Sequence, residues 1–202
     1  MEVRRRKLSQ VYPEGRWLFL TWHLHGSLPH GLYPPQGLPS GRSSYDKAFV
    51  WIDRFLDLAQ SGPMYLQMES IARLMQDSLQ WGAENGRYEL GPYVIMSNHV
   101  HALLLPKTPV PKLIQSLKGF TGKEANRILG RSGGPFWQSE TYDHFVRNAA
   151  EFDRIRRYIE QNPVKAGLAA TASAYRWSSA WREKPLKAAA DPHATTALSV
   201  HA

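Results

Sequence analysis

The chain has 202 residues, of which 43% are hydrophobic and 11% aromatic, so it can form a domain with a sizeable core and is not a wholly disordered protein. It has no cysteine, which excludes disulfides, thiolate zinc sites and cysteine nucleophiles. The net charge of +8 favours a polyanionic partner, nucleic acid above all.

The first half of the chain is expected to alternate between strands and helices. Alternating apolar residues indicate strands, apolar residues at helical spacing indicate helices, and clusters of Gly, Pro and Ser indicate loops. In chain order these signals predict a strand within 16–29, a loop over 30–44, helices over 43–62 and 63–82, and two strands within 87–106. The turn between the last two strands is expected at Ser97-Asn98.

The second half of the chain is expected to form a helix over 110–130, a strand in the later part of 135–148 and a helix over 149–162. Pro163 disfavours helical geometry at the residue before it, so the last helix is expected to end near Asn162. No Gly-rich phosphate loop follows a strand, which favours a single α+β domain over a nucleotide-binding α/β fold.

The positive charge is concentrated in one part of the sequence. Residues 107–187 hold 15 Lys/Arg and 7 Asp/Glu, whereas residues 1–106 hold 10 and 9. A solvated basic surface would give the same count, but a nucleic-acid interface is an equally good explanation. No stretch is long and apolar enough to span a membrane, so a soluble, cytoplasmic protein with no membrane partner is expected.

Two histidines interrupt an apolar strand in "MSNHVHALLLP" (96–106). Successive side chains of a strand alternate between its faces, so His99 and His101 share one face and can hold one divalent ion. Buried histidines that bond to the backbone would give the same pattern. The stretch "WHLH" has the same spacing, and its His23 and His25 are interpreted as ordinary strand residues.

The helix "RIRRYIEQNP" carries the second candidate group. Tyr158 lies among arginines, and Asn162 follows it by four residues on the same helical face. A tyrosine oxygen can attack a phosphodiester that a metal ion polarises, and Asn162 can supply a third ligand beside the two histidines. Tyr158 could equally be an aromatic residue at the edge of the core. Tyr142, in the polar stretch "SETYDHF", is the competing nucleophile, and the position of Asn162 and the arginines points to Tyr158.

Four segments in this order and spacing resemble the REP-associated tyrosine transposases, single-tyrosine relatives of the HUH transposases. They are "MSNHVHALLLP", "SLKGFTGKEANRILG", "PFWQSETYDHFVRN" and "YIEQNPVKAGL". The resemblance runs from the strand near Arg16 to "RWSSAW", and Ser97 stands where relatives often have proline. It implies a basic N-terminal segment over 1–15, one HUH transposase domain over 16–186 and a tail over 187–202 that is expected to be disordered.

The resemblance also implies a fold, a site and a reaction. The fold is α+β, with helices packed against a central antiparallel sheet in a ferredoxin-like or RRM-like HUH endonuclease arrangement. His99, His101 and Asn162 would be ligands of Mg²⁺ or Mn²⁺, and Tyr158 the nucleophile. The enzyme would cleave and rejoin single-stranded DNA at hairpin sites through a 5′-phosphotyrosine. Members of such families act as monomers or as dimers.

Basic residues after the second motif are candidates for contact with the DNA backbone. They are Lys118, Lys123, Arg127, Arg131, Arg147, Arg154 and Arg157. Phe136 and Trp137 could stack on unpaired bases, although a core position is the commoner role of such residues. Two other functions remain open: a non-catalytic nucleic-acid-binding protein derived from a transposase, and a structural metal-binding protein, which would leave the basic segment unexplained.

Overall fold

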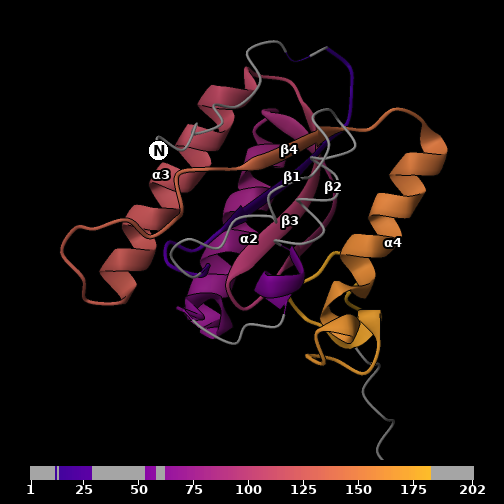
Figure 1. The fold of residues 1–202 in the computed structure, drawn as a ribbon. Helices are drawn as coiled ribbons and strands as arrows, with labels where there is room; N and C mark the ends of the chain where they lie inside the picture. The colour runs from indigo at the N-terminus through magenta and orange to yellow at the C-terminus, as the bar shows by residue number, and fades with distance from the viewer. Residues whose placement is uncertain (1–11, 13, 29–52, 58–61, 183–202) are drawn as a thin grey trace, which may run out of the picture.

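A four-stranded antiparallel sheet forms the centre of the fold (Figure 1). The computed structural model describes residue 12 and residues 14–28, 53–57 and 62–182. The strands are β1 (Leu18–His23), β2 (Tyr88–Ile95), β3 (His99–Pro106) and β4 (Tyr142–Phe145), in the spatial order β2-β3-β1-β4. This order, with helices between β1 and β2 and between β3 and β4, is that of a ferredoxin-like fold. The predicted fold class is confirmed.

Helices cover both faces of the sheet (Figure 1). Helices α2 (Glu69–Glu84) and α3 (Val110–Ile128) share a core with Leu18, Leu20 and Trp22 of β1. Helix α4 (Ala149–Lys165) packs on the opposite face with Phe19, because neighbouring residues of a strand point to opposite sides. The central strands of the sheet are therefore buried on both faces, so a polar group of β3 on the α4 face lies in a dry environment.

The predicted helix over 63–82 is interrupted at Met68. A 3-10 turn, η1 (Tyr65–Gln67), precedes it, and Met68 itself is extended with ψ 123° before α2 begins. Leu66 is buried, yet a continuous helix would place it about 140° away from Ile71. The break lets Leu66 reach the same core as the buried stripe of α2.

Helix α4 extends one turn beyond the predicted end at Asn162. Pro163 lies inside its last turn, and the amide of Ala166 still donates to the carbonyl of Asn162 at 3.0 Å. The helix begins at Asn148, whose side chain accepts a hydrogen bond from the amide of Glu151 at 2.9 Å. Both Tyr158 and Asn162 are thus held in regular helix.

The turn at Ser97-Asn98 lies between β2 and β3 as predicted. The predicted loop over 30–44, most of the predicted helix over 43–62, and the tail over 187–202 lie outside the described residues. Of the predicted helix, residues 53–57 are described and are helical. In the part of the chain that the structure describes, no helix has the length and apolar character to cross a membrane.

Candidate active site

His99 and His101 lie side by side at the start of β3 and face α4. Both side chains are fully buried, and their Nε2 atoms are 3.1 Å apart. The alternation of side chains along a strand brings them to one face, as predicted from their spacing. Two ligand atoms at right angles on an ion with bonds of about 2.1 Å would be about 3.0 Å apart, so the pair fits a shared ion.

Hydrogen bonds at the Nδ1 atom of each imidazole orient its Nε2 atom toward the site. The Nδ1 atom of His99 lies 2.7 Å from Asn98 Oδ1, and that of His101 lies 2.7 Å from Thr21 Oγ1. Burial, together with the neighbouring His101, holds the pKa of His99 well below its usual value. His99 is therefore neutral at pH 7 with the proton on Nδ1, which is the form that binds a metal ion.

Two carboxylates that the sequence interpretation did not include complete this site. Asp53 Oδ1 lies 3.1 Å from His101 Nε2, and Asp57 Oδ1 lies 3.6 Å from His99 Nε2. The two acids are four residues apart in the helical segment 53–57, so both point from one helical face toward β3. Burial raises the pKa of Asp57 to about 7, and the Asp53 carboxylate adds to the rise.

The donor set fits a divalent cation. The ligand atoms of Asp53, His99 and His101 all lie within 4.8 Å of one another, and the three residues are buried. The Oδ1 atoms of Asp53, Asp57 and Asn162 are buried and accept no hydrogen bond from the described residues. Buried acceptors without donors are costly, and a cation would satisfy several of them at once. The group can therefore hold a metal ion.

Helix α4 brings Tyr158 and Asn162 to this centre, as the family resemblance implied. The ring of Tyr158 lies 5.6 Å from the ring of His101, and Asn162 Nδ2 lies 3.3 Å from His101 Nε2. Oxygen and nitrogen of a carboxamide exchange places when the group rotates by 180°, which would bring Asn162 Oδ1 to the histidines. A phenol, a carboxamide, two imidazoles and two carboxylates thus meet in one buried centre.

Tyr142, the competing nucleophile, lies on the same face of the sheet. Phe19 packs edge-on against both tyrosines, with centroids 6.2 Å from each ring. Tyr158 shares its helix with Asn162 and packs on His101 directly. The assignment of Tyr158 as the nucleophile stays a prediction.

The N-terminal end of α4 is anchored to the end of β4 by Glu151. This carboxylate accepts hydrogen bonds from Arg147 and Arg154 and lies 3.2 Å from His144 Nε2. The hydrogen bonds from Arg147, reinforced by His144, lower the pKa of Glu151 to about 2. Arg147 and Arg154, two of the predicted DNA contacts, therefore also position the helix that carries Tyr158.

We expect Glu151→Gln to lower the free energy of unfolding by roughly 2 kcal/mol at pH 7. The folded pKa is below the unfolded value of 4.5, so the stabilisation is present above pH 4.5 and is lost as the pH falls toward 2. Urea unfolding at pH 7 and pH 3 should therefore show a difference that shrinks at pH 3. Glu160→Gln, which breaks a more exposed pair with Arg156, should cost less than about 1 kcal/mol. An equal loss for Glu151→Gln at both pH values would contradict the assignment.

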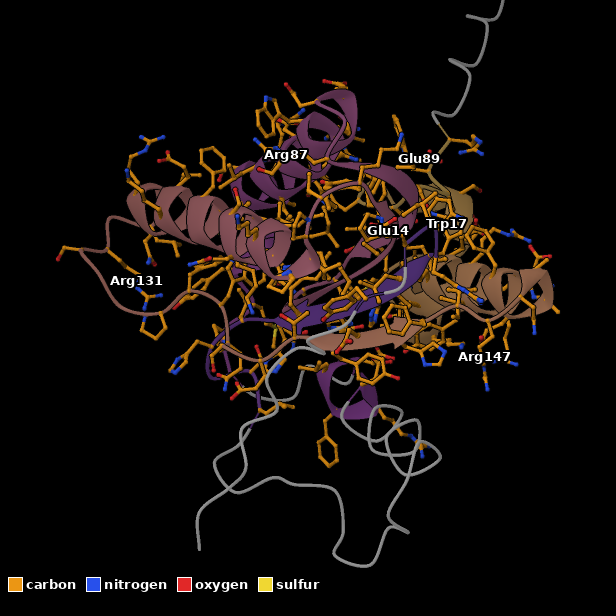
Figure 2. The ribbon with its side chains drawn as sticks, turned by 90° about the horizontal axis from the view of Figure 1, so that it is seen from above. Glu14, Trp17, Arg87, Glu89, Arg131 and Arg147 are labelled. Carbon is orange, nitrogen blue, oxygen red and sulfur yellow. The ribbon has the colours of Figure 1, made fainter. Side chains whose placement is uncertain are left out.

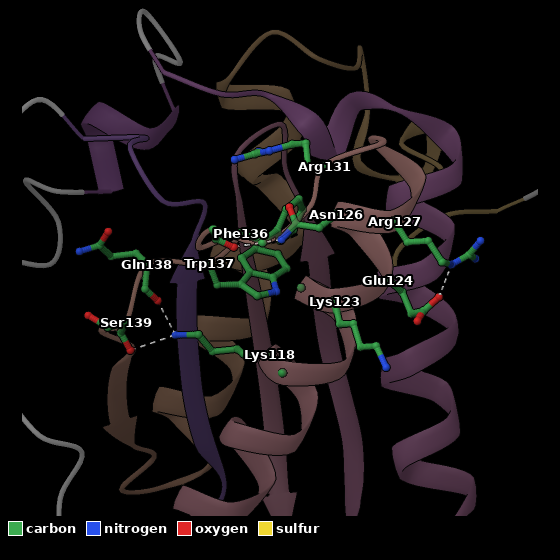
Figure 3. Close-up of a pocket in the computed structure, with 14 residues that line it drawn as sticks. Lys118, Lys123, Glu124, Asn126, Arg127, Arg131, Phe136, Trp137, Gln138 and Ser139 are labelled. Carbon is green, nitrogen blue, oxygen red and sulfur yellow. Dashed lines mark hydrogen bonds and ion pairs between the residues drawn. The ribbon is translucent and has the colours of Figure 1, made fainter.

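The predicted DNA-contacting cations form two separate groups. Arg147 precedes α4, and Arg154 and Arg157 lie within it, whereas the other four lie on α3 and the loop after it. Figure 2 shows Arg131 and Arg147 at opposite ends of the molecule. Lys118 donates to the carbonyl oxygens of Gln138, Ser139 and Glu140 at 2.6–3.2 Å, so its ammonium holds this loop (Figure 3). Phe136 and Trp137 are buried in the α3 core.

Comparison with known proteins identifies the family. Residues 65–162 match the family model described as "Transposase IS200 like". The chain carries an IS200-like transposase domain. This confirms the family that the four sequence motifs predicted. The match includes both histidines, Tyr158 and Asn162, but it starts after Asp53 and Asp57.

A solved structure of a transposase shares the fold of this domain. A REP-associated tyrosine transposase bound to a REP hairpin is 17% identical, with a TM-score of 0.54, over 86% of this chain and 82% of that chain. A protein from Deinococcus radiodurans R1, described as a candidate transposase, is also 17% identical, with a TM-score of 0.40, over 78% of this chain and 97% of that one. No curated protein matches the chain.

Proposed function

We propose that the chain is a metal-dependent transposase that cleaves and rejoins single-stranded DNA at hairpin sites through a 5′-phosphotyrosine. The observation that carries the proposal is the buried centre in which Tyr158 packs 5.6 Å from the ring of His101, beside Asp53 and His99. A structural metal site would need no tyrosine there. The family match supports a transposase, and the hairpin-bound relative suggests the form of the DNA.

The chain's own residues supply both the ligands and the nucleophile. His99, His101, Asp53 and the carboxamide oxygen of Asn162 would hold Mg²⁺ or Mn²⁺, two ions that accept oxygen ligands readily. When bound, the ion would withdraw charge from the scissile phosphate. Thr21 and Asn98 keep the imidazoles turned toward it. Asp57 lies behind His99 and adds negative charge to the site.

Tyr158 would perform the covalent step. Its hydroxyl gives its proton to solvent as the oxygen attacks the phosphorus, the bond from phosphorus to the 3′ oxygen breaks, and that oxygen leaves as a free 3′-hydroxyl after taking a proton from solvent. The product is a 5′-phosphotyrosyl protein. Attack by a second 3′-hydroxyl reverses the step and joins two strands, so no other energy source is required. Helix α4 is fixed at its start by Asn148 and Glu151, which keeps Tyr158 in place between turnovers.

The test is a search for the covalent intermediate itself. The purified protein is incubated with labelled single-stranded DNA that carries a hairpin, taken from the sequence that flanks its own gene, with Mn²⁺ or with EDTA. We expect an adduct that survives denaturation, forms only with Mn²⁺, and yields a tryptic peptide modified at Tyr158. DNA binding without an adduct under every ion tested would favour the non-catalytic DNA-binding protein instead.

A further inference from the structure

A cleft of about 650 Å³ lies between α3 and the loop that follows it, on the side of the sheet away from the histidines (Figure 3). Trp137 forms part of its wall, and Lys123, Arg127 and Arg131 line its rim. Glu124 is the one acid among its lining residues, and it pairs with Arg127 at 2.8 Å. The cleft therefore carries a net positive charge, which suits an anionic ligand.

The floor of the cleft lacks side chains where α3 passes beneath it. Gly119 and Gly122 both line it, one turn apart. A Cβ at Gly122 would lie in contact with Trp137 Cδ1 at 3.4 Å, so a side chain here would pack against the cleft wall. A Cβ at Gly119 would meet nothing within 4 Å among the described residues. Glycine inside a helix costs about 1 kcal/mol relative to alanine, and no internal contact accounts for that cost at Gly119.

Two further features point to a planar, hydrogen-bonding ligand. Asn126 lines the cleft, is 9% exposed and donates to Gly134, while its Oδ1 accepts no hydrogen bond from the described residues. Phe120 follows Gly119 on α3 and is 55% exposed, and it lies next to the lining residues of the cleft in the sequence without itself lining it. Exposed aromatic rings beside cations are the usual platform on which unpaired bases stack.

The cleft is connected to the candidate active site through β1. The amide of Gln138 donates to the carbonyl of His23, and the amide of His25 donates to the carbonyl of Phe136, both at 2.9 Å. His23 is in turn the register partner of His99. The cleft wall therefore adjoins the strand end that pairs with the first histidine, so a single DNA strand could reach both places around the end of the sheet.

We propose that this cleft binds unpaired nucleotides of single-stranded DNA. A base enters over Gly119 toward Asn126, and the flanking phosphates contact Lys123, Arg127 and Arg131. The choice of DNA as the ligand rests on the proposed function. The site would hold the substrate strand at a distance from the scissile phosphate, and so set which sequence is cut.

The test measures binding of a fluorescein-labelled single-stranded DNA by anisotropy. Gly119→Leu fills the floor, and leucine is a better helix former than glycine, so the variant should fold as stably as the wild type. We expect its Kd to rise at least tenfold. Gln115→Leu, which adds the same residue at an exposed position of α3 outside the cleft, should bind within twofold of the wild type.

The cations provide a second, independent readout. Arg131→Ala should weaken binding and reduce the slope of log Kd against log salt concentration by about 1. Arg87→Ala removes an exposed cation that does not line the cleft and that lies apart from Arg131 in Figure 2, and it should leave the slope unchanged. Wild-type affinity in Gly119→Leu would overturn the proposal. Equal competition by inorganic polyphosphate would overturn the part that concerns the base, and a preference for the same sequence as RNA would overturn the choice of DNA.

The same variants separate this proposal from the proposed function. If the wild type forms the Tyr158 adduct but Gly119→Leu binds DNA normally, the cleft assignment is wrong and the enzyme assignment stands. If no adduct forms under any ion, yet Gly119→Leu and Arg131→Ala both weaken binding, the cleft binds DNA and the catalytic assignment is wrong.

Discussion

Tyr158→Phe is expected to abolish the covalent protein–DNA adduct and to lower the rate of strand cleavage by on the order of 10³-fold or more. The substitution removes only the attacking oxygen. The phenyl ring keeps its contacts with Phe19 and His101, at centroid distances of 6.2 and 5.6 Å, so α4 and the metal ligands should stay in place. The adduct is measured on a denaturing gel, and binding of the same DNA is measured by anisotropy.

Tyr142→Phe is the matched control, because it removes the same atom from another tyrosine that packs on Phe19. This variant should form the adduct at the wild-type rate. Binding of DNA by Tyr158→Phe should stay within threefold of the wild type, which separates loss of chemistry from loss of substrate. An adduct that persists in Tyr158→Phe and disappears in Tyr142→Phe would assign the nucleophile to β4.

The features that could be predicted from the sequence are those that local geometry determines. The spacing of His99 and His101 places them on one strand face, whatever the strand packs against. The four-residue spacing of Tyr158 and Asn162 likewise places them on one helical face. The approach of these two pairs to each other depends on the tertiary structure, and only the resemblance to a family predicted it. The structure brings the pairs together with 3.3 Å between His101 Nε2 and Asn162 Nδ2.

Asp53 and Asp57 were missed for a physical reason. Two acids at a four-residue spacing on a helix usually mark its solvated face, so nothing in "WIDRFLDL" separates ligands from surface charges. Whether they are ligands or surface charges depends on how the segment 53–57 packs on β3. The burial of Leu56 between them, at 1% exposure, is the sign that this face turns inward. Two acids at helical spacing around an apolar leucine could therefore have been considered as further ligands beside His99 and His101.

The distribution of positive charge was predicted along the chain but not in space. The basic residues are concentrated in one part of the sequence, between 107 and 187, which suggested that they form one surface. Helix α3 and helix α4 lie on opposite faces of the sheet, so the charge divides between them (Figure 1). One group borders the cleft, and the other, through Arg147, Arg154 and Glu151, fixes the start of the tyrosine helix.

Asp53→Asn is expected to weaken Mn²⁺ binding by at least about tenfold, because it replaces a buried anionic ligand with a neutral one of the same shape. Titration calorimetry with MnCl₂ measures the affinity without reference to DNA. Asp77→Asn, the same change at an exposed position of α2, should leave the affinity within twofold of the wild type.

Thermal unfolding distinguishes a ligand from a merely structural partner of His101. The carboxylate of Asp53 is 4% exposed and lies 3.1 Å from His101 Nε2. If it is a ligand, the metal-free variant should melt no lower than the wild type, since a buried charge has been removed, and the rise in Tm on adding Mn²⁺ should be smaller. If Asp53 served only to hold His101, the metal-free protein would lose stability and the affinity for Mn²⁺ would change little. The second pattern would remove Asp53 from the metal site and leave His99, His101 and Asn162 as its candidate ligands.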